Sequence, residues 1–216
     1  MCSAKSFLVT TAIFFLAQGS ANAAEILASG SVNLPGITAS DFEKEPENDM
    51  DPFDRSSVCV ARSGSDSGAN YNYTASSDIG LGELKAFGQI SNGGGSLSSI
   101  EIGLVSANAR LQDTIIIESD SADDYDVIYE FHVDGLTDFS GGEGFAGASI
   151  STGSFSSQND FFNTRNSQVI DETLSVTRTY NGTIEQTLTL SLFLQLNVVN
   201  AGGSLTADLA NTATLN

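Results

Sequence analysis

Between Leu188 and Val198, leucine or valine occupies every second position of the chain. The residues between them are polar, with Phe193 as the exception. A period of two places the apolar side chains on one face of an extended strand, whereas an amphipathic helix needs a period near 3.6. The chain has no run of eleven or more residues with the helical period. The alternation therefore predicts a strand with one face in a core and one in water.

The same alternation recurs along the chain and predicts further strands. In one of them, Tyr125, Val127, Tyr129, Phe131 and Val133 share a face. Other expected strands cover 24–34, 56–62, 70–76, 82–91, 99–117 and 205–215, and the long 99–117 strand is expected to bend near 106–109. Many strands without helices predict an all-β fold, an antiparallel β-sandwich or jelly-roll-like single domain.

Asn181-Gly182 separates the expected strands 173–180 and 183–199 and is a strong hairpin signal. A two-residue turn would place Val176 opposite the polar Thr187. Because burial specifies register more strongly than turn preference, we expect a bulge or a longer loop at Thr183. Upstream, residues 134–168 alternate poorly and predict a loop with one short strand near 145–151.

Residues 1–23 carry the features of a secretory signal peptide. Lys5 is followed by an apolar run and by the small residues Ala21-Asn22-Ala23, which predicts cleavage between Ala23 and Ala24. The apolar run is about half of the ~20 residues that a membrane-spanning helix needs, so no membrane span is expected in the mature chain 24–216. Lys5 is the only charged residue removed, so the formal charge would change from −19 to −20. Nucleic acid would be repelled and is not an expected partner.

Few residues of the chain suit catalysis. Cys59 is the only cysteine left after cleavage, which excludes an intramolecular disulfide, and its strand-like run predicts a small buried residue. His132 is the only histidine and is interpreted as a surface residue. Asp66 occupies the serine position of a would-be nucleophile elbow. Paired carboxylates from distant loops leave no local signature, so a hydrolase stays open, but we expect no enzyme.

Five carboxylates lie close together between two expected strands, at Glu118, Asp120, Asp123, Asp124 and Asp126. They do not fit an EF-hand, because the sixth position counted from Asp120 is not glycine. The acidic stretch 41–54 does not fit either. We expect a water-exposed connection and no cofactor, with an irregular calcium site as the alternative.

Three segments carry a family resemblance: 109–117 with Asp113 and Thr114, 129–137 with Asp134 and Gly135, and 201–216 with Gly202, Gly203, Ser204, Asp208, Asn211, Thr212 and Ala213. In this order they resemble the exosortase-sorted (PEP-CTERM) exoproteins over roughly residues 75–216. The chain ends at Asn216 without the Pro-Glu-Pro box, helix and basic tail of that group, so we expect either truncation or another route. The resemblance implies secretion, or the cell surface, of a Gram-negative bacterium that makes exopolysaccharide, and carries over no functional residue.

Three functions follow as hypotheses. The first is a secreted, non-enzymatic surface or matrix β-sandwich, associated with extracellular polysaccharide or other cell-surface components. The second is a carbohydrate-binding, lectin-like module, with or without calcium, and the third is a hydrolase. A row of exposed aromatic side chains would favour the second, and the candidates are Phe139, Phe145, Phe155, Phe161 and Phe162.

Overall fold

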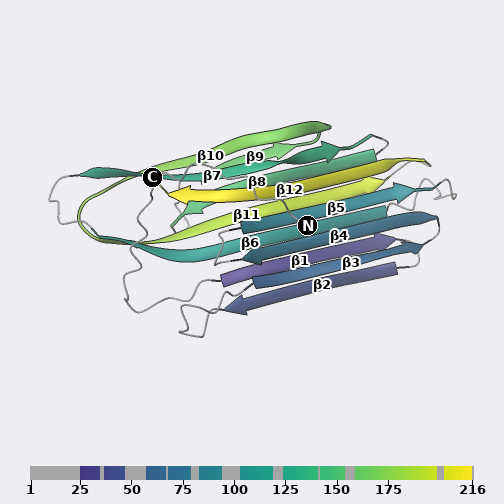
Figure 1. Ribbon diagram of the computed structural model, residues 1–216, viewed down its shortest axis with the longest axis horizontal. Coiled ribbons are helices and arrows are strands. Elements are labelled where there is room, and N and C mark those ends of the chain that lie inside the picture. Colours follow the sequence, from purple (N-terminus) through teal and green to yellow (C-terminus); the bar gives the residue numbers. More distant parts are fainter. Residues whose placement is uncertain are drawn as a thin grey trace, which may run out of the picture.

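The strands form two layers that run along the long axis of the molecule (Figure 1). The computed structural model describes residues 25–34, 37–46, 57–66, 68–78, 83–93, 103–118, 124–140, 142–153, 159–198 and 202–215. Within these ranges the regular structure is entirely strand. The expected signal peptide and its cleavage site at Ala23 and Ala24 lie outside the described residues.

Each layer is an antiparallel sheet of six strands. Sheet A has the order β2-β1-β6-β11-β8-β9, with β1 Glu25–Leu34, β2 Ile37–Pro46, β6 Gly103–Ile117, β8 Gly142–Thr152, β9 Asn159–Thr164 and β11 Ile184–Val198. Sheet B has the order β10-β7-β12-β5-β4-β3, with β3 Ser57–Asp66, β4 Ala69–Asp78, β5 Glu83–Asn92, β7 Tyr125–Asp138, β10 Gln168–Tyr180 and β12 Ser204–Leu215. The prediction of an all-β antiparallel sandwich is confirmed.

The core lies between the two sheets and is built by the predicted alternation. Leu190, Leu192, Leu194, Leu196 and Val198 of β11 are buried, and the residues between them face outward. The expected face of β7 is likewise buried from Val127 to Val133, with Tyr125 partly buried at its end. Full burial of a leucine-sized side chain contributes about 1.5–3 kcal/mol, so this alternation fixes which face of each strand points inward.

The expected hairpin at Asn181-Gly182 is wrong. Strand β10 belongs to sheet B and pairs with β7, whereas β11 belongs to sheet A and pairs with β6 and β8. The connection therefore crosses from one sheet to the other. Val176 and Leu190 both face the core from opposite sheets, so burial is satisfied without any pairing between the two strands and without a bulge.

Three other expectations change in detail. Residues 134–168 contain far more strand than expected, since β7 continues to Asp138 and is followed by β8 and β9. Strand β6 pairs with β1 and β11 in unbroken register through 106–109, where a bend was expected. Residues 41–46, read as part of an acidic loop, belong to the edge strand β2. This segment shows no clear alternation of apolar and polar residues, so the period of two did not predict a strand. An edge strand pairs with a neighbour on one side only and can leave one face in water.

Carboxylates join the two sheets along both lateral sides of the sandwich. There β2 lies next to β3, and β9 next to β10. Glu43 of β2 accepts a hydrogen bond from the backbone N–H of Cys59 in β3 at 2.9 Å. Asp160 of β9 accepts one from the backbone N–H of Ser175 in β10 at 3.0 Å. Each bond satisfies a donor on the open side of an edge strand, and the charge opposes pairing with another chain.

The β11 alternation predicts different costs for neighbouring truncations. Leu192 is fully buried and is flanked across the sheet by Ala109 and Ala148, which cannot fill a cavity. Leu192→Ala should lower the free energy of unfolding by about 2–5 kcal/mol. Thr189→Ala, on the outer face, should change it by no more than about 0.5 kcal/mol. Equal shifts of the two variants in urea unfolding would contradict this assignment of faces.

Candidate functional site

The acidic connection leads from β6 in sheet A to β7 in sheet B. Glu118, Asp124 and Asp126 are exposed, and Asp120 and Asp123 lie outside the described residues. Asn181 donates from Nδ2 to Oδ1 of Asp124 at 3.0 Å, and Thr179 donates its hydroxyl to Oδ1 of Asp126 at 2.6 Å. The first bond ties the end of the connection to the β10–β11 crossing, and the second joins two paired positions of β7 and β10. In the part of the chain that the structure covers, no three histidine, cysteine or carboxylate side chains are placed to share a metal ion.

His132 lies on the outer face of β7, as expected. Its Nδ1 is 3.2 Å from the hydroxyl of Thr173, and its Nε2 is 3.5 Å from a carboxylate oxygen of Asp171, which is itself highly exposed. Both partners come from β10, the neighbouring strand. Thr173, His132 and Asp171 thus lie side by side on the exposed outer face of sheet B, and neither of the two hollows described below includes them.

The lateral side formed by β2 and β3 contains an open hollow of about 420 Å³, lined by Asp41, Phe42, Glu43, Cys59, Val60, Ala61 and Arg62. Cys59 is exposed here, so its expected burial is wrong. Val58 and Val60 take the inward positions, and a period of two then turns the residue between them outward.

Asp41 is the centre of the polar contacts in this hollow. Arg62 donates from Nε and Nη2 to its two oxygens at 2.8 and 2.7 Å, and Tyr73 donates its hydroxyl at 2.6 Å. The Tyr73 ring lies against Gly30, where a Cβ would come within 2.2 Å of the ring. The hydrogen bonds from Arg62 and then Tyr73 lower the pKa of Asp41 from 3.8 to about 2. Asp41 therefore stays ionised and holds the sheets together, which does not suit a proton donor.

The two outer faces differ in charge. On the outer face of sheet B, strand β7 by itself contributes four carboxylates, at Asp126, Glu130, Asp134 and Asp138. Asp171 of β10 lies directly opposite Asp134. Like charges directly opposite each other are unfavourable and give this face a negative potential.

The outer face of sheet A is mostly uncharged. Its side chains are largely serine, threonine, asparagine and glutamine, for example Ser31 and Ser106, whose hydroxyls are 2.8 Å apart. The ionisable side chains described on this face are few: Glu25, Arg110, Glu143, Arg165 and Glu185. Such a face offers many neutral donors and acceptors on a hydrogen-bonded sheet.

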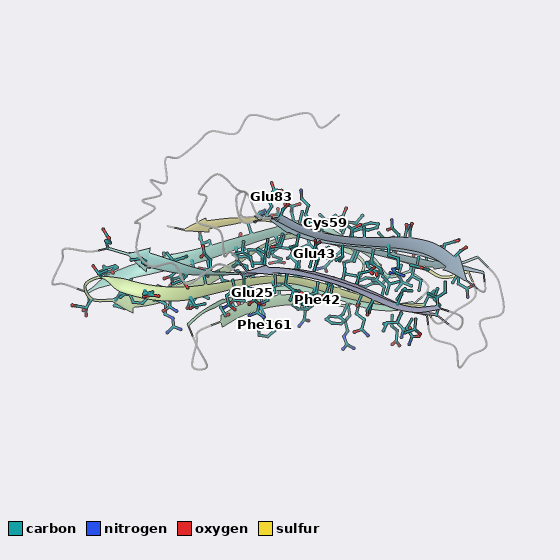
Figure 2. All side chains as sticks on the ribbon, turned by 90° about the horizontal axis from the view of Figure 1, so that it is seen from below. Glu25, Phe42, Glu43, Cys59, Glu83 and Phe161 are labelled. Carbon is teal, nitrogen blue, oxygen red and sulfur yellow. The ribbon has the colours of Figure 1, made fainter. Side chains whose placement is uncertain are left out.

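Aromatic side chains lie on this same face, with one mostly exposed ring on each edge strand. Phe42 of β2 and Phe161 of β9 are 65% and 64% exposed. Figure 2 shows both on one side of the sandwich, opposite Cys59 and Glu83 of sheet B. Phe145 of β8 and Phe193 of β11 pack against each other, with ring centroids 5.7 Å apart.

A small hollow of about 130 Å³ lies beside Phe145. It is lined by Glu143, Gly144, Phe145, Arg165, Gln195 and Asn197. The Oδ1 atom of Asn197 is buried without a hydrogen-bond partner. The hollow thus combines an aromatic ring with amide, carboxylate and guanidinium groups, which together can bind a ligand rich in hydroxyl groups.

The aromatic candidates from the sequence separate into three groups. Phe145 and Phe161 lie on the outer face of sheet A. Phe139 is buried and Phe162 packs against the core, while Phe155 lies outside the described residues. Phe42 and Phe193 were not among the candidates. The exception at Phe193 in the β11 alternation was the signal that could have identified it, since only an outward residue can break that pattern.

The Asp41 contacts predict a pH-dependent contribution to stability. The pKa of Asp41 is lowered on folding, so its contribution should be complete above about pH 4 and lost as the pH falls towards 2. Asp41→Ala should therefore lower the urea midpoint at about pH 6 and lower it much less at about pH 2. Asp208→Ala, at an exposed position, serves as the control. An Asp41→Ala effect of equal size at both pH values would contradict the ionic role.

The exposed positions of Glu118, Asp124 and Asp126 predict no response to calcium. A cation bound there would stabilise the fold by mass action, by about 2.7 kcal/mol at a hundred times its dissociation constant. We expect the same melting temperature in millimolar calcium and in chelator. A calcium-dependent rise that disappears in Asp123→Asn/Asp124→Asn would instead identify a metal site.

The comparisons with known proteins leave the family open. The chain matches no protein-family model and no curated protein. Among solved structures it aligns with the enzymatically active domain of tailspike protein 4 of bacteriophage CBA120, at 10% identity and a TM-score of 0.18, over 73% of this chain and 19% of that one. It also aligns with infectious bursal disease virus, Gx strain, at 10% identity and a TM-score of 0.17, over 88% of this chain and 56% of that one. Both TM-scores are too low to support a conclusion about fold or function.

Within the described residues there is no helix with the length and hydrophobicity that crossing a membrane requires.

Proposed function

We propose that the protein is a secreted, non-enzymatic β-sandwich that binds extracellular polysaccharide through the outer face of sheet A. The observation that carries the proposal is the contrast between the faces. Sheet A presents neutral hydroxyl and amide groups together with Phe42, Phe145, Phe161 and Phe193, whereas β7 of sheet B presents a line of carboxylates.

Polysaccharides match the chemistry of the sheet A face. A pyranose ring has an apolar C–H surface, which packs on aromatic rings, and a rim of hydroxyl groups, which bond to amides and hydroxyls. A hydrogen-bonded sheet packed on a core also fixes these groups in advance, so little conformational entropy is lost on binding. The PEP-CTERM-like segments agree with a location on the surface or in the matrix of an exopolysaccharide-producing bacterium. No calcium is needed, because the contacts are neutral.

Co-sedimentation tests this function. Purified protein should co-sediment with at least one of insoluble cellulose, chitin or mannan, and it should release no new reducing ends from the polymer. Phe42→Ala/Phe161→Ala should reduce the bound fraction severalfold, because both rings are mostly exposed and their loss leaves the core intact. Val169→Ala, which is 77% exposed on β10 of sheet B, is the matched control and should bind normally. Release of reducing ends, or loss of binding only in the control, would contradict the proposal.

A further inference from the structure

We infer that the polysaccharide is uncharged and that it lies across the strands of sheet A, along one transverse row of side chains. This inference rests on the proposed function and specifies its ligand. The pairing register places six residues, one from each strand, in a single row: Phe42, Ser29, Asn108, Phe193, Gly147 and Asn163.

The charge distribution selects an uncharged polymer. None of the six residues of the row is ionisable, and the whole chain has a formal charge of −19. A polyanion approaching sheet A gains no ion pair along the row and is repelled by the net charge of the protein. A polycation would instead be drawn to the carboxylates of β7 on the opposite face. An uncharged glycan is the class of polymer that the row can contact without electrostatic repulsion.

The spacing of the row selects the transverse direction. Neighbouring strands are about 4.8 Å apart, so Phe42 and Phe193, three strands apart, are separated by about 14 Å. Ser29 and Asn108 fill the interval with a hydroxyl and an amide. On its own strand and face Phe193 has Ser191 and Gln195 as neighbours but no second ring within β11, whereas the transverse row joins Phe193 to the ring of Phe42.

Gly147 shapes the middle of the row. A Cβ at this position would lie 2.7 Å from Cε2 and Cζ of Phe193, so the ring extends over the glycine and onto β8. On the side of Gly147 away from Phe193, the next residue of the row is Asn163 on β9. The ring therefore covers the sheet surface instead of standing away from it, which leaves a platform on which a sugar ring can stack.

The 130 Å³ hollow adjoins this platform and contacts the sugar hydroxyls. Phe145 connects the two, since it packs against Phe193 and also lines the hollow. Glu143 and Arg165 bring opposite charges that leave the hollow neutral, and Asn197, whose Oδ1 is buried without a hydrogen-bond partner, also lines it.

Affinity electrophoresis in gels containing a soluble polymer tests the inference. Hydroxyethyl cellulose serves as the uncharged probe and alginate as the polyuronate, both in chelator at about physiological salt. The protein should be retarded by hydroxyethyl cellulose and not by alginate. Phe42→Ala/Phe193→Ala should weaken retardation at least about tenfold, and Asn108→Ala, which leaves the rings in place, should weaken it less.

The control is Ile128→Ala/Leu136→Ala, which removes two exposed apolar side chains from the outer face of sheet B and should leave retardation unchanged. Melting curves of all variants verify that they are folded. Retardation by alginate alone, or undiminished retardation of the Phe42→Ala/Phe193→Ala variant, would overturn the uncharged transverse ligand while leaving the proposed function standing. Failure to bind these polymers together with failure to co-sediment with the insoluble ones would overturn both.

Discussion

Burial of alternate side chains between two sheets is the interaction on which the rest of this structure depends. It sets the register of every pair of strands, because a shift by one residue would turn a whole apolar face into water. It also decides what faces outward. Phe193 lies on the surface because Leu192 and Leu194 occupy the inward positions on either side of it. The candidate binding row is thus a consequence of the core, and its rigidity comes from the same packing.

The outward half of each strand is not constrained by the core, and the two sheets use that freedom differently. Sheet B has the carboxylates of β7, including the unfavourable opposition of Asp134 and Asp171. Sheet A has hydroxyls, amides and rings. A surface that keeps its charge on one side can remain soluble and avoid self-association while the other side stays free of repulsion towards a neutral ligand. The carboxylates at the lateral sides, Glu43 and Asp160, belong to the same pattern, since they satisfy edge donors that would otherwise attract other strands.

The sequence predicted most of the strands but not β2 or β9, and it predicted the strand partners poorly. A period of two is a local property, so the faces of β7 and β11 could be assigned without a structure. Which strands pair is decided by packing between sheets, and the Asn181-Gly182 signal misled because it reports only the local turn. Cys59 was expected to be buried because it lies in a short strand-like run, although the alternation with Val58 and Val60 already places it on the outward face. The site was harder still. Phe42 and Phe193 share one transverse row because of the pairing of two intervening strands, β1 and β6. Nothing in the sequence near either residue indicates that they lie in the same row.

The order of strands in sheet B has a consequence for how the molecule is assembled. Strand β12 lies between β5 and β7, although it follows every other strand in the chain. Until it is in place, β5 and β7 each expose a full row of unpaired backbone donors and acceptors towards the gap. A β12 segment from a second copy makes the same hydrogen bonds as the molecule's own. The gap is therefore the point at which crowded, newly made chains can exchange strands, and dilution during folding favours the closed monomer over an interlinked chain of subunits.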